Sequence, residues 1–402
     1  MTGIGAVVPM AGAGAAALLL GLLLTEAMRR FALRHGITDR PSARKAHTRP
    51  TPYLGGVAVA LATLAVGTAV ALARGVFNPV LAVVLGGAAI VCVLGLIDDL
   101  RQLGPKVRLC VETSAATLVV VVGGHPTVFD GAVDAVLAAL WIVFVTNAFN
   151  LLDNMDGAAS SLCVVIGGFV CLTVPAGDPI GLGVVMAALA GAGLGFLFHN
   201  RHPARIFLGD AGSLFLGFTL ASAMMVCHGG AAGLSGPASL LLATLVPTLD
   251  TALVMLSRYR ESRPLLQGGT DHIAHRLRRM GLTVPQVVQT LSAFAVVGCL
   301  SAMLVTDGLL APGIALLAAC AVGIGSVRLL LEVPAVATAS PRVAVPAGAL
   351  ADGGARTALR WRLSAVSRLR HRAVRPTGVP HSREATNAAA LSPTAGTLVA
   401  PQ

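Results

Sequence analysis

Long apolar runs alternate with short polar segments along most of this chain. A run of about 17–25 apolar residues is long enough to cross a membrane as a helix. The sequence contains eleven such runs, at approximately 5–27, 53–73, 76–97, 108–124, 131–152, 160–175, 179–198, 211–228, 237–257, 286–306 and 311–331. The pattern therefore predicts an all-α, polytopic membrane protein with about eleven transmembrane helices within residues 1–332.

Composition supports a membrane protein rather than a string of soluble domains. Hydrophobic residues make up 55% of the 402-residue chain, and charged residues make up only 12%. Soluble globular domains average about 25% charged residues. The charge deficit outweighs the chain length, which by itself would suggest about two or three soluble domains.

The basic residues give the predicted helices an orientation. If the N-terminus lies outside, every Lys and Arg except Arg74 falls in a loop or tail on the inner side. Cytoplasmic loops of membrane proteins carry such an excess of basic residues. We therefore predict an outside N-terminus, a cytoplasmic C-terminus and a location in the inner (plasma) membrane. No basic region precedes the first run, so that run is predicted to be a retained helix rather than a signal peptide.

The net charge of +11 is explained by this basic cytoplasmic face. Such a face lies against anionic lipid head groups and can collect anionic substrates. With only two Trp and two Tyr in the chain, an aromatic platform for nucleic acid is not expected, and no nucleic-acid partner is predicted. Residues 333–402 are rich in Ala, Pro, Arg, Thr and Ser without periodicity, and are predicted to form a basic, disordered tail.

Five polar segments all fall on the predicted cytoplasmic side. They occupy 40–56, 95–106, 147–157, 199–213 and 257–282, whereas the outer loops are short and carry few charges. A transporter would place polar groups near the middle of the bilayer and at both mouths. Polar groups at one face instead favour an enzyme of the inner leaflet that takes one membrane-bound and one cytosolic substrate.

Two of these segments place carboxylates at predicted helix ends. Asp98 and Asp99 are adjacent, and a solvated helix end is one interpretation, although carboxylates at a helix C-terminus oppose the helix dipole. Asp210 in "FLGDAGS" precedes an apolar run, so N-capping by Asp210 or Ser213 is one interpretation. The functional interpretation is that a Gly-flanked carboxylate at a helix N-terminus holds a divalent cation beside backbone donors for phosphate.

Four polar residues recur at three-residue spacing in "NAFNLLDNMDG". They are Asn147, Asn150, Asp153 and Asp156. On a continuous helix they would share one face. Capping would explain one or two of them but not all four, so we expect them to form one wall of a site.

The fifth segment adds histidines and arginines. His272 and His275 could be surface residues, but they stand beside Arg276, Arg278 and Arg279, which favours anion binding. Acidic groups, cations and a group that orients a nucleophile together suit phosphoryl transfer. The expected cofactor is Mg²⁺, because the candidate ligands are oxygens, and Mn²⁺ is an open alternative.

The ordered motifs resemble a known enzyme superfamily. The segments "RKAHTRPTPYLGG", "GLIDDLRQLGPK", "NAFNLLDNMDGAA", "IFLGDAGSLFLG", "PTLDT" and "DHIAHRL" follow one another over roughly residues 40–282. Together they resemble the polyprenyl-phosphate N-acetylhexosamine-1-phosphate transferases, which include phospho-MurNAc-pentapeptide translocases and GlcNAc-1-phosphate transferases. The "DNMDG" and "DHIAHRL" spellings look closer to the GlcNAc branch, from whose usual pattern Asn154 and Ala274 depart.

The resemblance implies transfer of a sugar 1-phosphate from a UDP-sugar to polyprenyl phosphate, with Mg²⁺ and release of UMP. GlcNAc-1-phosphate is the leading expectation, as the first membrane step of a cell-envelope glycan. One alternative is a phospho-MurNAc-pentapeptide transferase of peptidoglycan synthesis. Another is a transporter or lipid-binding relative that has lost catalysis. Homodimers occur in the family, and the oligomeric state of this chain stays open.

The resemblance also implies residue roles. Asp98 and Asp99 match a pair near the lipid phosphate, with Asp98 expected to engage or deprotonate the nucleophile, and Asp210 matches the Mg²⁺ ligand. The expected catalytic set is Asp98, Asp99, Asp153, Asp156 and Asp210. The expected substrate contacts are Asn147, Asn150, Phe207 (stacked on uracil), His272 and His275 (near the sugar phosphate), and Lys45, His47 and Lys106 (on phosphates).

Overall fold

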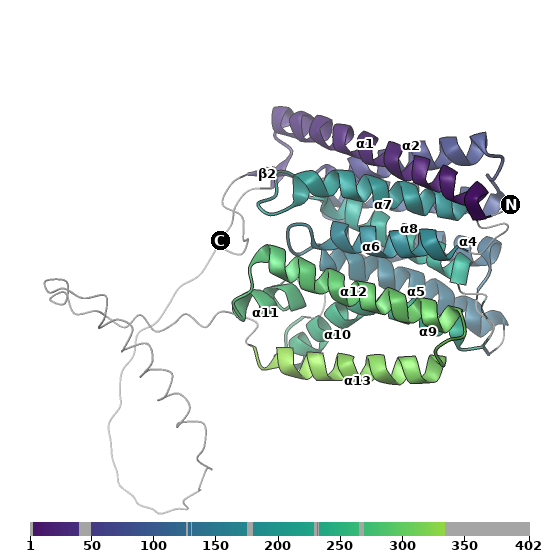
Figure 1. The fold of residues 1–402 in the computed structure, drawn as a ribbon. Coiled ribbons are helices and arrows are strands. Elements are labelled where there is room, and N and C mark those ends of the chain that lie inside the picture. The colour runs from purple at the N-terminus through teal and green to yellow at the C-terminus, as the bar shows by residue number, and fades with distance from the viewer. Residues whose placement is uncertain are drawn as a thin grey trace, which may run out of the picture. The chain divides into compact units, whose positions relative to one another are not determined.

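A computed structural model of the chain describes residues 3–39, 50–125, 128–129, 131–174, 180–228, 231, 233–264 and 269–333. These residues are mostly helical (Figure 1). The helices are α1 (Gly3–His35), α2 (Gly55–Ala73), α3 (Pro79–Leu100), α4 (Pro105–Gly123), α5 (Gly131–Leu152), α6 (Ala158–Thr173), α7 (Ile180–Asn200), α8 (Gly209–His228), α9 (Ser235–Ala243), α10 (Leu245–Arg260), α11 (Ile273–Arg279), α12 (Val284–Thr306) and α13 (Pro312–Leu331). Lys45, His47 and the predicted tail from residue 334 onward lie outside the described residues.

Each predicted apolar run coincides with a helix or with a pair of helices. Among the described residues, eight helices are long and apolar enough to cross a membrane, and α9 with α10, bent by 71° at their break, makes a ninth if the pair is one span. The other two runs are α6, which has only 16 residues, and α4, which carries Lys106, Arg108 and Glu112. The chain is a multi-pass membrane protein, while the count of eleven spans and the orientation stay predictions.

A short antiparallel sheet is present that the apolar pattern does not predict. Strand β1 (Thr38–Asp39) pairs with β2 (Thr51–Pro52), with Thr38 opposite Pro52. The backbone N–H of Phe207 then donates to the Pro52 carbonyl at 2.8 Å, and Gly55 N–H donates to the Phe207 carbonyl at 3.0 Å. The segment before α2 is thereby fixed against the segment before α8.

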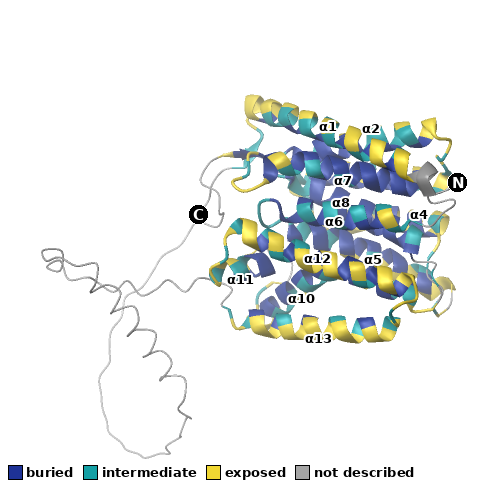
Figure 2. Cartoon of the chain, viewed as in Figure 1, coloured by how far each residue is buried: buried dark blue, intermediate teal, exposed yellow. Residues whose placement is uncertain are grey.

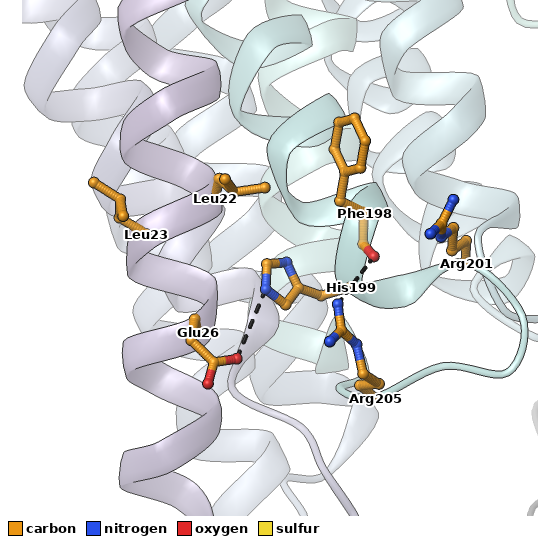
Figure 3. Close-up of a pocket in the computed structure, with 7 residues that line it drawn as sticks. All are labelled: Leu22, Leu23, Glu26, Phe198, His199, Arg201 and Arg205. Carbon is orange, nitrogen blue, oxygen red and sulfur yellow. Dashed lines mark hydrogen bonds and ion pairs between the residues drawn. The ribbon is translucent and has the colours of Figure 1, made fainter.

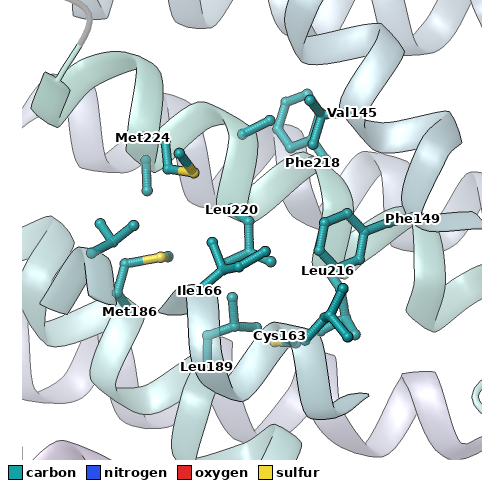
Figure 4. Close-up of a cluster of buried hydrophobic side chains, with 14 of the residues drawn as sticks. Val145, Phe149, Cys163, Ile166, Met186, Leu189, Leu216, Phe218, Leu220 and Met224 are labelled. Carbon is teal, nitrogen blue, oxygen red and sulfur yellow. The ribbon is translucent and has the colours of Figure 1, made fainter. Parts of the chain in front are cut away.

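Helix α8 lies at the centre of the packed helices. In its most apolar stretch 94% of the residues are buried, against 22% in α1 and 17% in α13 (Figure 2). It packs against α3, α5 and α2. Figure 4 shows part of the core, a cluster to which α5 contributes Phe149, α6 Ile166, α7 Leu189 and α8 Phe218.

Glycines allow two helix pairs to meet at backbone distance. A Cβ on Gly56 of α2 would lie 2.1 Å from the Cα of Gly212 of α8. A Cβ on Gly191 of α7 would lie 2.1 Å from the carbonyl oxygen of Gly14 of α1. Such separations exclude any side chain larger than hydrogen, as is usual at close membrane-helix contacts. The first contact fixes the start of α8, where the candidate site lies.

Candidate active site

The N-terminus of α8 is capped by a carboxylate from another helix. Asp99, in the last turn of α3, accepts hydrogen bonds from the backbone N–H of Asp210 at 2.9 Å and of Ala211 at 3.0 Å. Gly209 precedes them with φ +74°, and a Cβ there would lie 2.7 Å from the Asp99 Oδ2. The cap therefore comes from Asp99 and not from Asp210 or Ser213, and Asp210 directs its side chain elsewhere.

Arg108 of α4 joins the other two carboxylates. Its Nη1 donates to Asp98 Oδ2 at 2.7 Å and to Asp210 Oδ2 at 3.3 Å, and its Nη2 donates to Asn150 Oδ1 at 3.3 Å. Asn150 Nδ2 in turn donates to Asp210 Oδ1 at 2.8 Å and to Ser213 Oγ at 2.9 Å. The ends of α3, α4, α5 and α8 thus meet in one polar network, which brings together predicted residues that lie far apart in sequence.

Asp153 lies next to this network with an unbalanced charge. Burial raises its pKa to about 8, and the negative charges of Asp210, Asp99 and Asp156 act in the same direction. Within the described part of the chain no hydrogen bond reaches its carboxylate. Carboxylates crowded in this way favour a proton or a bound cation.

Asp156 does not share a face with Asp153, contrary to the prediction from spacing. The α5 helix ends at Leu152, so both residues lie beyond it. Asp156 Oδ2 lies 2.7 Å from His202 Nδ1 and accepts from the Ala204 backbone N–H at 3.1 Å. In this structure Asp156 anchors the loop between α7 and α8.

Asn147 and Asn150 do share a face of α5, but they contact different partners. Asn147 donates through Nδ2 to Glu112 Oε2 of α4 and, at 2.9 Å, to the Val143 carbonyl. Glu112 is fully buried, and its Oε1 has no hydrogen-bond partner among the described residues. Asn147 thus takes part in the α4–α5 contact, and its contact with substrate stays a prediction.

His272 and His275 flank the start of α11, where His272 is buried and His275 is half-buried. His272 is buried, with Nδ1 at 2.8 Å from Asp250 Oδ2, and Asp250 Oδ1 accepts from the Ile273 backbone N–H at 2.7 Å. Burial lowers the pKa of His275 to about 4, and the charges of His272 and Arg279 add to this effect. No described contact joins either histidine to the carboxylate network.

The arginines near these histidines are largely engaged within the protein. Arg258 and Arg263 donate to the Asp271 carboxylate at 3.1 and 2.5 Å, and Arg276 donates to the Asp271 carbonyl at 3.0 Å. Burial alone would raise the pKa of Asp271, but the hydrogen bonds from Arg263 and Arg258 outweigh it and lower that pKa. Arg276, predicted among the anion-binding residues, instead holds α11 in place.

The other two predicted substrate contacts among the described residues are Phe207 and Lys106. Phe207 is half-buried, and its backbone pairs with the segment before α2 as described above. Lys106 is exposed in the first turn of α4, two residues before Arg108. Both are within reach of solvent beside the polar network.

Comparison with known proteins places this geometry in a family. The sequence profile described as Glycosyl transferase family 4 matches residues 81–228, which run from α3 to α8 and include the whole polar network. A Streptomyces coelicolor protein named as a glycosyltransferase is 40% identical over 73% of this chain and 69% of its own length. The chain belongs to glycosyl transferase family 4.

Two further family members carry more specific names. A Bacillus subtilis protein named as an undecaprenyl-phosphate N-acetylglucosaminyl 1-phosphate transferase is 33% identical over 66% of this chain and 76% of its own length. The decaprenyl-phosphate N-acetylglucosaminephosphotransferase of Mycolicibacterium smegmatis is 33% identical over 67% of this chain and 75% of its own length. The family match ends before α11, so the carboxylate network lies inside it and the histidines lie outside it.

Two residues of α4 are not singled out by the sequence patterns: Arg108, which lies in the polar network, and Glu112, which contacts Asn147. Arg108 and Glu112 lie four residues apart at the start of an apolar run, where a basic residue by itself indicates only topology. Such a pair lies on one face of a helix. Ionisable residues inside a membrane run usually face the protein interior and mark a function. That signal was available in the sequence.

The residues of the network suit a hard cation. Within the described ranges, no group of three Asp, Glu, His or Cys side chains forms a complete metal site. Asp210, with 36% of its side chain exposed, and Asp153 nonetheless supply oxygen donors. Mg²⁺ in phosphoryl-transfer sites is commonly held by one or two carboxylates together with substrate phosphates and water. The chemistry of the donor set therefore fits Mg²⁺ in a site that the substrate completes.

Proposed function

We propose that this chain transfers GlcNAc-1-phosphate from UDP-GlcNAc to polyprenyl phosphate, at the cytoplasmic face of the plasma membrane. The observation that carries the proposal is the network of Asp98, Arg108, Asn150 and Asp210, with Asp153 beside it, at the ends of apolar helices. The names of the Bacillus and Mycolicibacterium relatives and the "DNMDG" and "DHIAHRL" spellings support GlcNAc as the sugar.

In the proposed reaction a phosphate oxygen of the lipid attacks the β-phosphorus of UDP-GlcNAc. The bond from that phosphorus to the bridging oxygen breaks, so UMP leaves and a polyprenyl-pyrophosphoryl sugar forms. When bound, Mg²⁺ would supply charge neutralisation at the pyrophosphate and would be held by Asp210 and Asp153.

The residues of the chain then have separate tasks. Arg108, held between Asp98 and Asp210, presents a guanidinium to phosphate oxygens, for which its planar fork is well suited. Asp98 engages the lipid phosphate and accepts its proton if that phosphate arrives protonated. Burial and neighbouring carboxylates raise the pKa of Asp153, and a bound cation would stabilise its charged form. Asp99 acts on the reaction only through the backbone of α8.

The proposal is tested by UMP release from UDP-GlcNAc. The purified chain is placed in vesicles with polyprenyl phosphate and Mg²⁺. We expect Asp98→Asn and Asp210→Asn each to lower the rate by about a hundredfold or more, the usual scale for removing a charge from such a site. Asp307→Asn, which removes an exposed carboxylate at the end of α12, is the matched control and should leave the rate unchanged. Full activity in both site variants would contradict the roles assigned here.

The alternatives are separated in the same assay. UDP-MurNAc-pentapeptide is offered beside UDP-GlcNAc, and a preference for it would move the chain to the peptidoglycan branch. A transporter or a lipid-binding relative without catalysis would bind polyprenyl phosphate or UDP-sugar and release no UMP from either donor. The presence of the complete carboxylate set argues against lost catalysis.

A further inference from the structure

A pocket outside the polar network lies between α1 and the end of α7. It has a volume of about 380 Å³ (Figure 3). Leu22, Leu23 and Phe198 form its apolar wall, and Arg201 and Arg205 form its basic end. The pocket therefore changes from apolar to cationic along its length.

The acidic group in this pocket is already balanced by its own helix. Glu26 accepts hydrogen bonds from Arg29 at 2.8 and 2.9 Å and from Arg30 at 2.7 Å. His199 lies farther from it, with Nε2 at 3.7 Å from Glu26 Oε2. The negative charge of Glu26 is thus matched within α1.

Arg201 and Arg205 are not balanced in the same way. Both are exposed, and the contact found for Arg205 is a hydrogen bond from Nη2 to the Phe198 carbonyl at 3.4 Å. Across the described residues no carboxylate pairs with either guanidinium. Two unpaired guanidiniums at one end of a pocket favour an anion with several oxygens, above all a phosphate.

The expected depth of the pocket in a bilayer agrees with its change from an apolar wall to a basic end. Helix α1 has 33 residues, carries no charged residue before Glu26, and continues through Arg29 and Arg30. The hydrocarbon core is about 30 Å thick, or about 20 helical residues, which places its edge near Glu26. Leu22 and Leu23 then lie at the depth of acyl chains, and the basic end lies at the depth of head groups.

The loop that carries the arginines is held from the active-site side. Asp156 accepts from the Ala204 backbone N–H at 3.1 Å and lies 2.7 Å from His202 Nδ1. A second hollow of about 420 Å³ continues along this loop and is also lined by Arg201 and Arg205. The two guanidiniums therefore project from an anchored segment, which lowers the entropy cost of binding a head group.

We propose that this pocket binds the head group of an anionic phospholipid. The phosphodiester would lie on Arg201 and Arg205, and one acyl chain would follow Leu22, Leu23 and Phe198. An ordinary membrane lipid fits better than the lipid substrate because the pocket is formed by α1 and α7, whereas the polar network is formed by α3, α4, α5 and α8. The proposal does not depend on the transferase activity.

Native mass spectrometry of the full chain in neutral detergent tests the proposal. Phosphatidylglycerol and phosphatidylcholine with the same acyl chains are titrated separately. We expect phosphatidylglycerol to bind at least about tenfold more tightly, and the Arg201→Gln/Arg205→Gln variant to lose that preference, as charge-assisted hydrogen bonds to phosphate are removed. Arg260→Gln/Arg328→Gln, which removes two exposed arginines elsewhere, is the matched control and should keep the preference.

Several results would overturn the proposal. The two lipids could bind wild type equally, or the control could lose as much preference as the pocket variant. Inorganic phosphate could displace phosphatidylglycerol, which would indicate a site for free phosphate. Polyprenyl phosphate could displace it at far lower concentration, which would assign the pocket to the lipid substrate. Thermal unfolding of each variant is recorded as a check of folding. If the double variant is not folded, the lipid preference of the Arg201→Gln variant tests the proposal instead.

Discussion

At the scale of single residues, the two adjacent carboxylates of "IDD" have different partners. Asp98 forms an ion pair with Arg108, whereas Asp99 accepts two backbone N–H groups of α8. Because neighbouring side chains at the end of a helix diverge, Asp98 contacts α4 and Asp99 contacts α8. The consequence is that the two substitutions should fail in different ways.

Asp99→Ala should lower stability as well as activity. It leaves the N–H groups of Asp210 and Ala211 without their acceptors, and each such loss costs about 1–3 kcal/mol when the group is buried. Asp98→Asn should lower activity with a smaller change in stability, because Arg108 keeps Asp210 and Asn150 as partners. Denaturant unfolding in detergent and UMP release measure the two effects. Equal loss of stability in both variants would contradict this division.

The neutral state of His275 predicts a pH-dependent stability. Its pKa falls from an ordinary 6.5 to about 4 in the folded chain, mainly through burial. Between these values the unfolded chain binds more protons, so stability should fall as the pH drops through this window. His275→Gln should remove up to about 3 kcal/mol of that fall. Unfolding of both proteins at the two ends of the window provides the measurement, and parallel losses would argue against a buried neutral imidazole.

Sequence spacing identified some site residues and misplaced others for a physical reason. Asp98, Asn150 and Asp210 were predicted together and do meet in one network. Asp156 was misplaced because three-residue spacing continues past Leu152, where the helix ends, and the letters "LLDNMDG" do not mark that end. Arg108 is not predicted from the apolar pattern because a basic residue at the edge of an apolar run usually marks only topology, although Glu112 four residues later adds a second charge to the same helix face.

At the scale of helices, the contact between α2 and α8 predicts a glycine requirement. Gly56→Ala would place a Cβ 2.1 Å from the Gly212 Cα, so α2 and the start of α8 would have to separate. We expect a lower unfolding temperature and a loss of activity. Gly86→Ala on the exposed face of α3 is the control, since nothing lies within 4 Å of its Cβ, and it should be neutral or slightly stabilising. Similar behaviour of the two variants would contradict the close contact.

Helix positions were predictable from apolar length, but breaks and short strands were not. Every run became helical because a backbone in lipid must satisfy its own hydrogen bonds. Pro247 marks the break between α9 and α10, although the length of the apolar run does not show it. Proline has no backbone N–H and so cannot donate to the Ala243 carbonyl one turn earlier. The strands β1 and β2 have two residues each, too few to show an alternating pattern.

At the scale of the whole molecule, the charge distribution predicts which side each loop faces. On a background without native cysteines, Arg74→Cys and Arg260→Cys each place one thiol at an exposed position. We expect a membrane-impermeant maleimide to label the first in intact cells and the second only after permeabilisation, because basic loops remain in the cytoplasm. The opposite labelling pattern would reverse the predicted orientation.

The contact between Gly14 of α1 and Gly191 of α7 also bears on how the chain is assembled. Helix α1 leaves the ribosome before its main partner, α7, and the five helices α2 to α6 are made between them. Helix α1 can remain in the membrane without its partner because lipid tails are as apolar as leucine. Exposing its glycine-containing face to lipid therefore costs little free energy. Docking of α7 must then expel the lipid that filled the seam, and this late step also forms the pocket between the two helices.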